Sequence, residues 1–269
     1  MTFDQKYFDI GRLDRLSYQD TFMHRLDPRV KVIATIFFLL TVISFPKYEV
    51  GGLLPFFLFP VLIMTVGEIP VMFIMKKVML VSPFALFIGV FNPFLDAGTV
   101  AVIGGIPVAA GWLSFLTIIL KFVLTISAAL LLIATTSFPG VCHALRLLGC
   151  PALLVSQLLF LYRYIFVLME EAMRMIRARE IRSFGGRGAG IKGFVRLTGV
   201  LFLRTVERAE RVYYAMLSRG FRGDLSILKR SRLEWKDMAF LAMTVVMLIV
   251  FRYYQVTEEL GCLVQELIR

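Results

Sequence analysis

The chain has 269 residues, of which 58% are hydrophobic and 18% charged, and its formal net charge is +11. Soluble globular domains carry about 45–50% apolar and 25% charged residues, so this composition excludes an ordinary soluble domain and indicates an all-α integral membrane protein. Three cysteines and two histidines, after a polar start without a cleavable signal pattern, exclude a secreted disulfide scaffold and predict reduced, buried thiols.

Residues 1–29 form the first predicted element, an N-terminal arm. Its basic residues are Lys6, Arg12, Arg15, Arg25 and Arg29. Because cytoplasmic segments beside membrane spans accumulate Lys and Arg, we expect this arm on the cytoplasmic side.

Residues 30–138 contain four runs that match the roughly 17–25 apolar helical residues needed to cross a bilayer core. The predicted spans are 30–45, 50–66, 78–95 and 112–138, the first two being only marginally long enough. Four crossings place Lys76 and Lys77 inside and the 96–111 loop outside. That loop contains no Lys or Arg, so the charges agree with a cytoplasmic arm.

Residues 139–236 are predicted to form a cytoplasmic or interfacial coupling region of amphipathic helices. Residues 170–236 hold sixteen Lys and Arg against seven Asp and Glu. If the apolar run 152–169 crossed the membrane, this basic block would face outward, so we interpret the run as half of a long helix at the membrane interface. The alternative, in which 152–169 is itself a span and the chain has six, stays open.

Glycine and proline mark the predicted helix ends in this region. Residues 138–151 predict a short amphipathic helix closed by Gly149 and Pro151. The stretch "GGRGAGIKG" (185–193) formally contains G-x-G-x-x-G, but no strand precedes it, so it predicts a break between two helices and not a nucleotide site. The helix after it gathers arginines on one face, namely Arg196, Arg204, Arg208 and Arg211.

The remaining predicted element is a C-terminal span at 238–254, within a last segment of residues 237–269. It brings the expected total to five spans.

A seven-residue cassette occurs twice near predicted helix ends, as "AREIRSF" (178–184) and "AMLSRGF" (215–221). Ala178 and Ala215 are small enough for another helix to approach, while Ser183 and Gly220 permit the chain to turn. Arg182 and Arg219 would project beyond the last turn, where a guanidinium suits a partner's carboxylates. The alternative is an ordinary helix end, at which Arg complements the helix dipole for about 0.3–1 kcal/mol.

These cassettes, with "HRLDPRVKVIATIFF" (24–38) before the first span, resemble the transmembrane T component of energy-coupling factor transporters. The stretches "LDRLSYQDTFMHRLDPR" and "SPFALFIGVFNPFLD" (82–96) are similar to its CbiQ-like cobalt and nickel branch. The similarity covers about residues 10–255.

The resemblance implies a coupling subunit of an ATP-driven importer in the cell inner (cytoplasmic) membrane, and its CbiQ-like branch implies cobalt or nickel as the cargo. Its implied partners are two ABC ATPases and a substrate-binding, CbiM-like membrane subunit. Arg182 and Arg219 would insert into grooves of the two ATPases, with Ala178, Ser183, Ala215 and Gly220 as cassette partners. Ser183 departs from the glycine of many relatives, which weakens the transfer at that position.

Catalytic chemistry is not expected of the chain itself. No P-loop motif occurs, so ATP hydrolysis would belong to a partner, and we expect no cofactor and no nucleic acid. Cys142, His143 and Cys150 match no closed metal site, and buried packing is their expected role. The carboxylates among the arginines (Glu170, Glu171, Glu207 and Glu210) predict ion pairs within each helix.

A second function class remains open, namely a self-sufficient secondary transporter or channel whose basic loop binds anionic lipid. Such a protein needs ionisable residues along a path through the membrane. Lys121 and Arg163 are the two inside apolar runs, with no acidic residue at matching depth, which disfavours this class.

Overall fold

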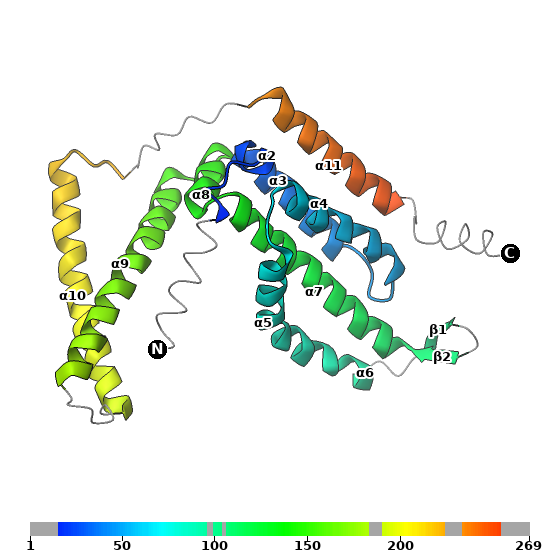
Figure 1. The fold of residues 1–269 in the computed structure, drawn as a ribbon, viewed down its shortest axis with the longest axis horizontal. Coiled ribbons are helices and arrows are strands. Elements are labelled where there is room, and N and C mark those ends of the chain that lie inside the picture. Colours follow the sequence, from blue (N-terminus) through cyan, green and yellow to red (C-terminus); the bar gives the residue numbers. More distant parts are fainter. Residues whose placement is uncertain (1–15, 96–98, 104–105, 183–189, 224–232, 254–269) are drawn as a thin grey trace. The chain divides into compact units, whose positions relative to one another are not determined.

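The computed structural model describes residues 16–95, 99–103, 106–182, 190–223 and 233–253 (Figure 1). Most of the predicted N-terminal arm, Ser183, the glycine-rich residues up to 189 and the C-terminal tail lie outside the described residues. The chain divides into two compact units. We call Phe8–Val141 with Ser231–Arg269 the bundle unit, and Met1–Tyr7 with Cys142–Arg230 the hairpin unit.

Helices dominate both units, which confirms the all-α class. In chain order they are α2 (Phe22–Arg25), α3 (Pro28–Ile43), η1 (Gly51–Phe57), α4 (Leu58–Val66), α5 (Val71–Val90), α6 (Asn92–Leu95), α7 (Ala110–Thr135), α8 (Phe138–Leu147), α9 (Ala152–Arg182), α10 (Gly190–Ser218) and α11 (Trp235–Tyr253). The expected long helix through residue 169 is confirmed, since α9 runs unbroken for 31 residues. The break expected at 185–193 falls between α9 and α10.

Two local features differ from the sequence-based expectation. The third span begins at Val71 and not at residue 78, because Pro70 has the extended backbone of a helix N-cap and the chain turns helical directly after it. Lys76 and Lys77 are therefore helical and not loop residues. The predicted outer loop also contains a short antiparallel hairpin of β1 (Thr99–Ile103) and β2 (Ile106–Ala109).

The second span combines two kinds of helix. η1 is a seven-residue 3-10 helix with Pro55 inside it, and α4 continues it for nine residues. Because a 3-10 helix rises about 2.0 Å per residue and an α-helix about 1.5 Å, the pair reaches roughly 27 Å, against roughly 24 Å for an α-helix of equal length. The 3-10 turn thus brings a short apolar segment close to the bilayer thickness.

Aromatic side chains fill the core of the bundle unit. Phe38 of α3 stacks on Phe59 of α4 with ring centroids 4.3 Å apart. Phe56 of η1 meets Phe45 edge-on at 5.2 Å and Phe251 of α11 at 5.8 Å. Such pairs stabilise by about 0.5–1.5 kcal/mol beyond their burial, so they fix η1 and α4 against α3 and α11.

One end of the bundle unit is held by buried charges. The Lys31 ammonium, near the start of α3, donates to the carbonyls of Met23 (3.1 Å) and Thr135 (2.9 Å), the latter at the end of α7. The backbone N–H of Asp27 donates to the Asp237 carboxylate (2.8 Å) near the start of α11. The starts of α3 and α11 and the end of α7 therefore meet here.

Cations also hold the opposite end. Lys121 of α7 donates to the carbonyls of Ile43 (3.3 Å) and Phe45 (2.6 Å), where α3 ends. Arg252, at the end of α11, donates to the Ser44 hydroxyl (3.4 Å). Hence α3 and α11 run parallel, and α7 runs antiparallel to both.

These directions constrain the chain between α7 and α11. It leaves the bundle unit after Val141 and returns at Ser231, at the same end of that unit. If the bundle spans the membrane, the chain from 142 to 230 crosses it an even number of times. α10 contains Arg196, Arg204 and five further charged residues and is not an apolar span, so α9 crossing alone is disfavoured.

Length and composition alone do not show whether α9 crosses the membrane. Among the described residues α5, α7 and α9 are long and apolar enough to cross a membrane. α3 has only 16 residues, and α11 carries Lys236, Asp237 and Arg252 at its two ends. That α9 does not cross stays a prediction, which the parallel course of α3 and α11 supports.

We expect single cysteines at positions 148 and 177, on either side of the apolar half of α9, to react with an impermeant maleimide from one membrane face. Leu148→Cys and Arg177→Cys would be made in a chain without its native cysteines. Lys47→Cys, after α3, is the control and should react from the other face. Labelling of positions 148 and 177 from opposite faces would show that α9 crosses.

Candidate functional site

The two cassettes belong to the hairpin unit, in which α9 and α10 lie side by side and antiparallel (Figure 1). Gly193, near the start of α10, is covered by the Arg179 guanidinium near the end of α9, and a side chain at 193 would collide with it. Phe221, just beyond the end of α10, meets Phe160 of α9 edge-on at 6.1 Å. Contacts at both ends therefore fix the direction of each helix.

One row of α10 forms its seam with α9. Gly193 is buried, and the residues that follow it at intervals of four, Leu197, Leu201 and Thr205, are half-buried in a helix that is otherwise mostly exposed. Residues four apart share one helix face, so this row is the face that packs. The bare Gly193 gives the close approach at its first turn.

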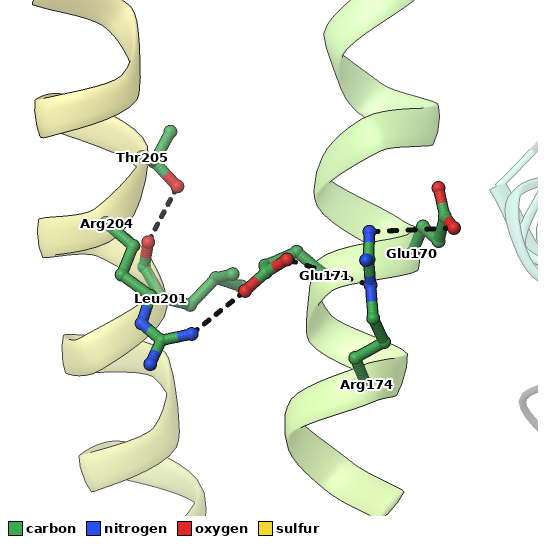
Figure 2. Close-up of polar contacts among 6 residues, drawn as sticks. All are labelled: Glu170, Glu171, Arg174, Leu201, Arg204 and Thr205. Atoms are coloured by element: carbon green, nitrogen blue, oxygen red, sulfur yellow. Dashed lines mark hydrogen bonds and ion pairs between the residues drawn. The ribbon is translucent and has the colours of Figure 1, made fainter.

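An ion pair joins the middles of the two helices (Figure 2). Arg204 donates to the Glu171 carboxylate at 2.9 Å, and Arg174 lies 3.8 Å from the other oxygen of that carboxylate. The prediction of pairs within each helix is confirmed for Glu170 with Arg174 (3.5 Å). It is incomplete for Glu171, whose shorter contact reaches the other helix. With Arg204 58% exposed, such a pair contributes about 0.2–1 kcal/mol and mainly sets the register of the helices.

The second cassette is a Schellman helix end. Gly220 has φ +78°, the left-handed conformation that glycine adopts without strain. Its N–H donates to the Leu217 carbonyl (2.9 Å), and the N–H of Phe221 donates to the Met216 carbonyl (3.0 Å). These two bonds define the motif, in which Arg219 is the capping residue. The expected turn at Gly220 is confirmed, and Phe221 is in position to pack on α9.

The first cassette is described only in part. Arg182 is the last residue of α9, while Ser183 lies outside the described residues. Ala178, Ala215, Arg182 and Arg219 are all exposed. The alanines are therefore not part of the seam between α9 and α10, and their use by a partner stays a prediction.

The two arginines mark opposite ends of the hairpin. Arg182 lies where α9 meets the start of α10, and Arg219 follows the end of α10, which has 29 residues. At about 1.5 Å per residue, α10 separates the two ends by roughly 42 Å. Within the part of the chain that the structure describes, neither guanidinium contacts a carboxylate.

α10 also presents an exposed apolar row that the sequence analysis did not identify. Its members recur at intervals of four and seven and are Ile191, Val195, Phe202, Val206, Tyr213 and Leu217. Such spacing keeps residues on one helix face, as in a coiled-coil seam. The spacing of these residues is visible in the sequence, but the arginines of the same helix show an equally regular spacing. An exposed row of this length is typical of an interaction surface.

Residues considered for other chemistry have structural roles here. Lys121 donates to backbone carbonyls, as described above, and Arg163 is exposed. Cys142 is buried, and this burial raises the pKa of its thiol, which disfavours the thiolate that a metal requires. Among the described residues no group of three or more His, Cys, Asp or Glu side chains could hold a metal ion.

Known proteins are similar to this chain over most of its length. A family model, CbiQ, described as "Cobalt transport protein", matches residues 19–232. An uncharacterized protein of Methanocaldococcus jannaschii is 28% identical over 234 residues, which cover 83% of this chain and 80% of that protein. "Energy-coupling factor transporter transmembrane protein EcfT" of Staphylococcus aureus is 26% identical over 254 residues, covering 87% and 94% of the two chains. "Nickel permease LarQ" of Lactiplantibacillus plantarum is 27% identical over 121 residues, or 45% of this chain and 44% of that one.

We expect Gly220→Ala to destabilise the end of α10 by about 1–2 kcal/mol, because an L side chain at positive φ is strained. The amides of Gly220 and Phe221 should then exchange hydrogen faster. Gly199→Ala is the matched control: it lies inside α10 with open space around it and should stabilise the helix by about 1 kcal/mol. Unchanged exchange at the α10 end of Gly220→Ala would contradict the capping role.

Proposed function

The chain belongs to the CbiQ family of cobalt transport proteins, and we propose that it is the energy-coupling transmembrane subunit of an ATP-driven importer. In this proposal two cytoplasmic ATPases move, and the chain passes their movement to a substrate-binding membrane subunit. The relatives named as energy-coupling factor transmembrane proteins support this role over most of their length. The cargo we propose is cobalt or nickel, in keeping with the family description and with the nickel permease among the relatives.

The observation that carries the proposal is the placement of Arg182 and Arg219. They are exposed and lie at opposite ends of one helical hairpin, roughly 42 Å apart along α10. One groove of one partner is too short to take both. Two equivalent grooves, one on each of two ATPases, fit this separation.

The chemistry of each helix end suits such a groove. A guanidinium presents five N–H donors in a rigid fork that matches a carboxylate. The Schellman turn fixes the backbone at Arg219, so less backbone freedom is lost when the helix end docks. An arginine that only complemented the helix dipole would need neither the turn nor the second copy at Arg182.

The hairpin can transmit force because contacts join its two helices at three points. Arg179 covers Gly193, Glu171 pairs with Arg204, and Phe221 packs on Phe160. Movement at either arginine therefore displaces both helices together, as in rigid-body transitions.

The apolar row of α10 is the surface we propose for the substrate-binding subunit. It runs the length of the helix between the two arginine-bearing ends, from Ile191 to Leu217. A partner embedded in the membrane offers the apolar side chains that such a row requires. Movement of the helix ends would then reach that partner directly.

A self-sufficient transporter has less support. Lys121, which would line the path of such a transporter, instead donates to the carbonyls at the end of α3. The buried charges of the bundle unit lie at one end of the helices and not along them.

We expect the double change Arg182→Glu and Arg219→Glu to release the ATPases and abolish uptake while the chain stays in the membrane. Truncating one side of a desolvated ion pair costs about 2–5 kcal/mol, and reversing the charge adds repulsion. Co-purification of the ATPases from detergent and uptake of cobalt and nickel ions by cells are the measurements. Arg196→Glu, the same change at an exposed arginine away from the cassettes, should retain both. Normal uptake by the double variant would refute the proposal.

The double change Phe202→Glu and Val206→Glu should remove the substrate-binding subunit from the complex and leave the ATPases bound, because unpaired charges are costly in an apolar interface. Composition of the purified complex is the measurement. Leu203→Glu, between the two positions but off the apolar row, is the control and should leave the complex intact. Retention of the membrane subunit by the double variant would contradict this use of the row.

A further inference from the structure

We propose that residues 24–31, which join α2 to α3, hold two of the places at which the chain passes between the two units, namely the connections after α7 and before α11. We call these residues the 24–31 turn. Its positioning contacts are made by Lys31 and by Asp237, whose carboxylate accepts from the N–H of Asp27. The inference rests on the function proposed above, since it names the point at which movement of the hairpin unit enters the bundle unit.

The outgoing connection is held at the end of α7. Lys31 is buried, and its ammonium donates to the Thr135 carbonyl as well as to that of Met23. Nε2 of His24 lies 3.3 Å from the Ala134 carbonyl. A carbonyl only accepts, so this nitrogen carries the proton and Nδ1 accepts from the Thr21 hydroxyl. The last carbonyls of a helix lack partners within it and carry partial negative charge, which makes them natural ligands for a cation.

The returning connection is held at the start of α11. One oxygen of the buried Asp237 carboxylate accepts from the N–H of Asp27, the N-cap residue of α3. The other oxygen accepts from the N–H of Glu234 (2.8 Å), directly before α11. One carboxylate therefore caps two helices, where the partial positive charge of each N-terminus favours it.

The positions of these contacts along the chain are the reason to assign them a coupling role. The bundle unit ends at Val141, six residues after Thr135, and resumes at Ser231, six residues before Asp237. These two connections are thus fixed to the same turn within six residues of leaving or entering the bundle unit. A displacement carried along either connection would therefore be passed to α3 at this turn.

Stabilisation alone does not explain why Lys31 and Asp237 are buried. Buried ionic groups are often replaced by apolar residues without loss of stability, and their better attested use is to specify one arrangement. Lys121 gives a comparison inside the same protein. It donates to two carbonyls at the opposite end of α3, away from the connections that follow α7 and precede α11.

The test follows nucleotide-driven movement at two positions in the purified complex with its ATPases. An environment-sensitive fluorophore is placed on Arg208→Cys in the hairpin unit or on Leu40→Cys in α3, both exposed, in a chain without native cysteines. A non-hydrolysable ATP analogue should change the signal at both positions. This readout does not require the identity of the transported ion.

We expect Lys31→Met and Asp237→Ala to keep the response at position 208 and to reduce the response at position 40 by roughly fivefold or more, the lower range of allosteric coupling. Lys31→Arg keeps a charged donor and Asp237→Asn keeps one acceptor oxygen, so these two variants should recover part of the response at position 40. They also replace Lys31→Met and Asp237→Ala if those variants do not accumulate in the membrane. Lys121→Met, the matched control, should keep both responses.

Three results would overturn the proposal. One is an undiminished response at position 40 in Lys31→Met and Asp237→Ala. Another is equal loss in Lys121→Met, which would show that any weakening of α3 suffices. The third is the absence of a response at position 208 in the parent complex, which refutes the proposed function and this inference with it. The first two leave the proposed function intact, so the failures are distinguishable.

Discussion

The buried carboxylate of Asp237 is the contact on which the arrangement of this protein depends. It accepts hydrogen bonds from backbone N–H groups at the starts of α3 and α11, two helices whose contacting residues are 210 positions apart. Since both oxygens are used, a buried charge is accommodated without an unpaired acceptor. The two helices must then start at the same end of the bundle unit, and the chain between them must return to the end that it left.

Residues 142–230 therefore leave the bundle unit and return to it at the same end. The connections after α7 and before α11 both lie at this end of the bundle unit. Within the hairpin unit, Arg179 over Gly193 and Phe221 against Phe160 join α9 and α10 near both ends. The same antiparallel packing carries Arg182 and Arg219 to opposite ends, so one hairpin presents two exposed arginines with an apolar row between them.

Local sequence patterns were sufficient for much of this description. Apolar runs predicted the membrane helices, and the long helix through residue 182 followed from an unbroken helical pattern. The turn at Gly220 followed from the cassette, because positive φ is a property of one residue and its neighbours. The start of α5 does not follow from the apolar run, because Lys76 and Lys77 interrupt that run inside the helix, whereas Pro70 fixes the helix start.

What the sequence by itself determined is therefore the set of helices, their membrane character and the two arginine-bearing ends, all of which depend on residues within a few turns of each other. Only the tertiary structure decided which partner each charge takes. Glu171 has a suitable arginine in its own helix and a closer one 33 residues away, and Asp237 finds its partner in another helix entirely. Spacing along the chain does not distinguish these choices, because they depend on which helix ends and faces come within hydrogen-bond distance once the helices have packed.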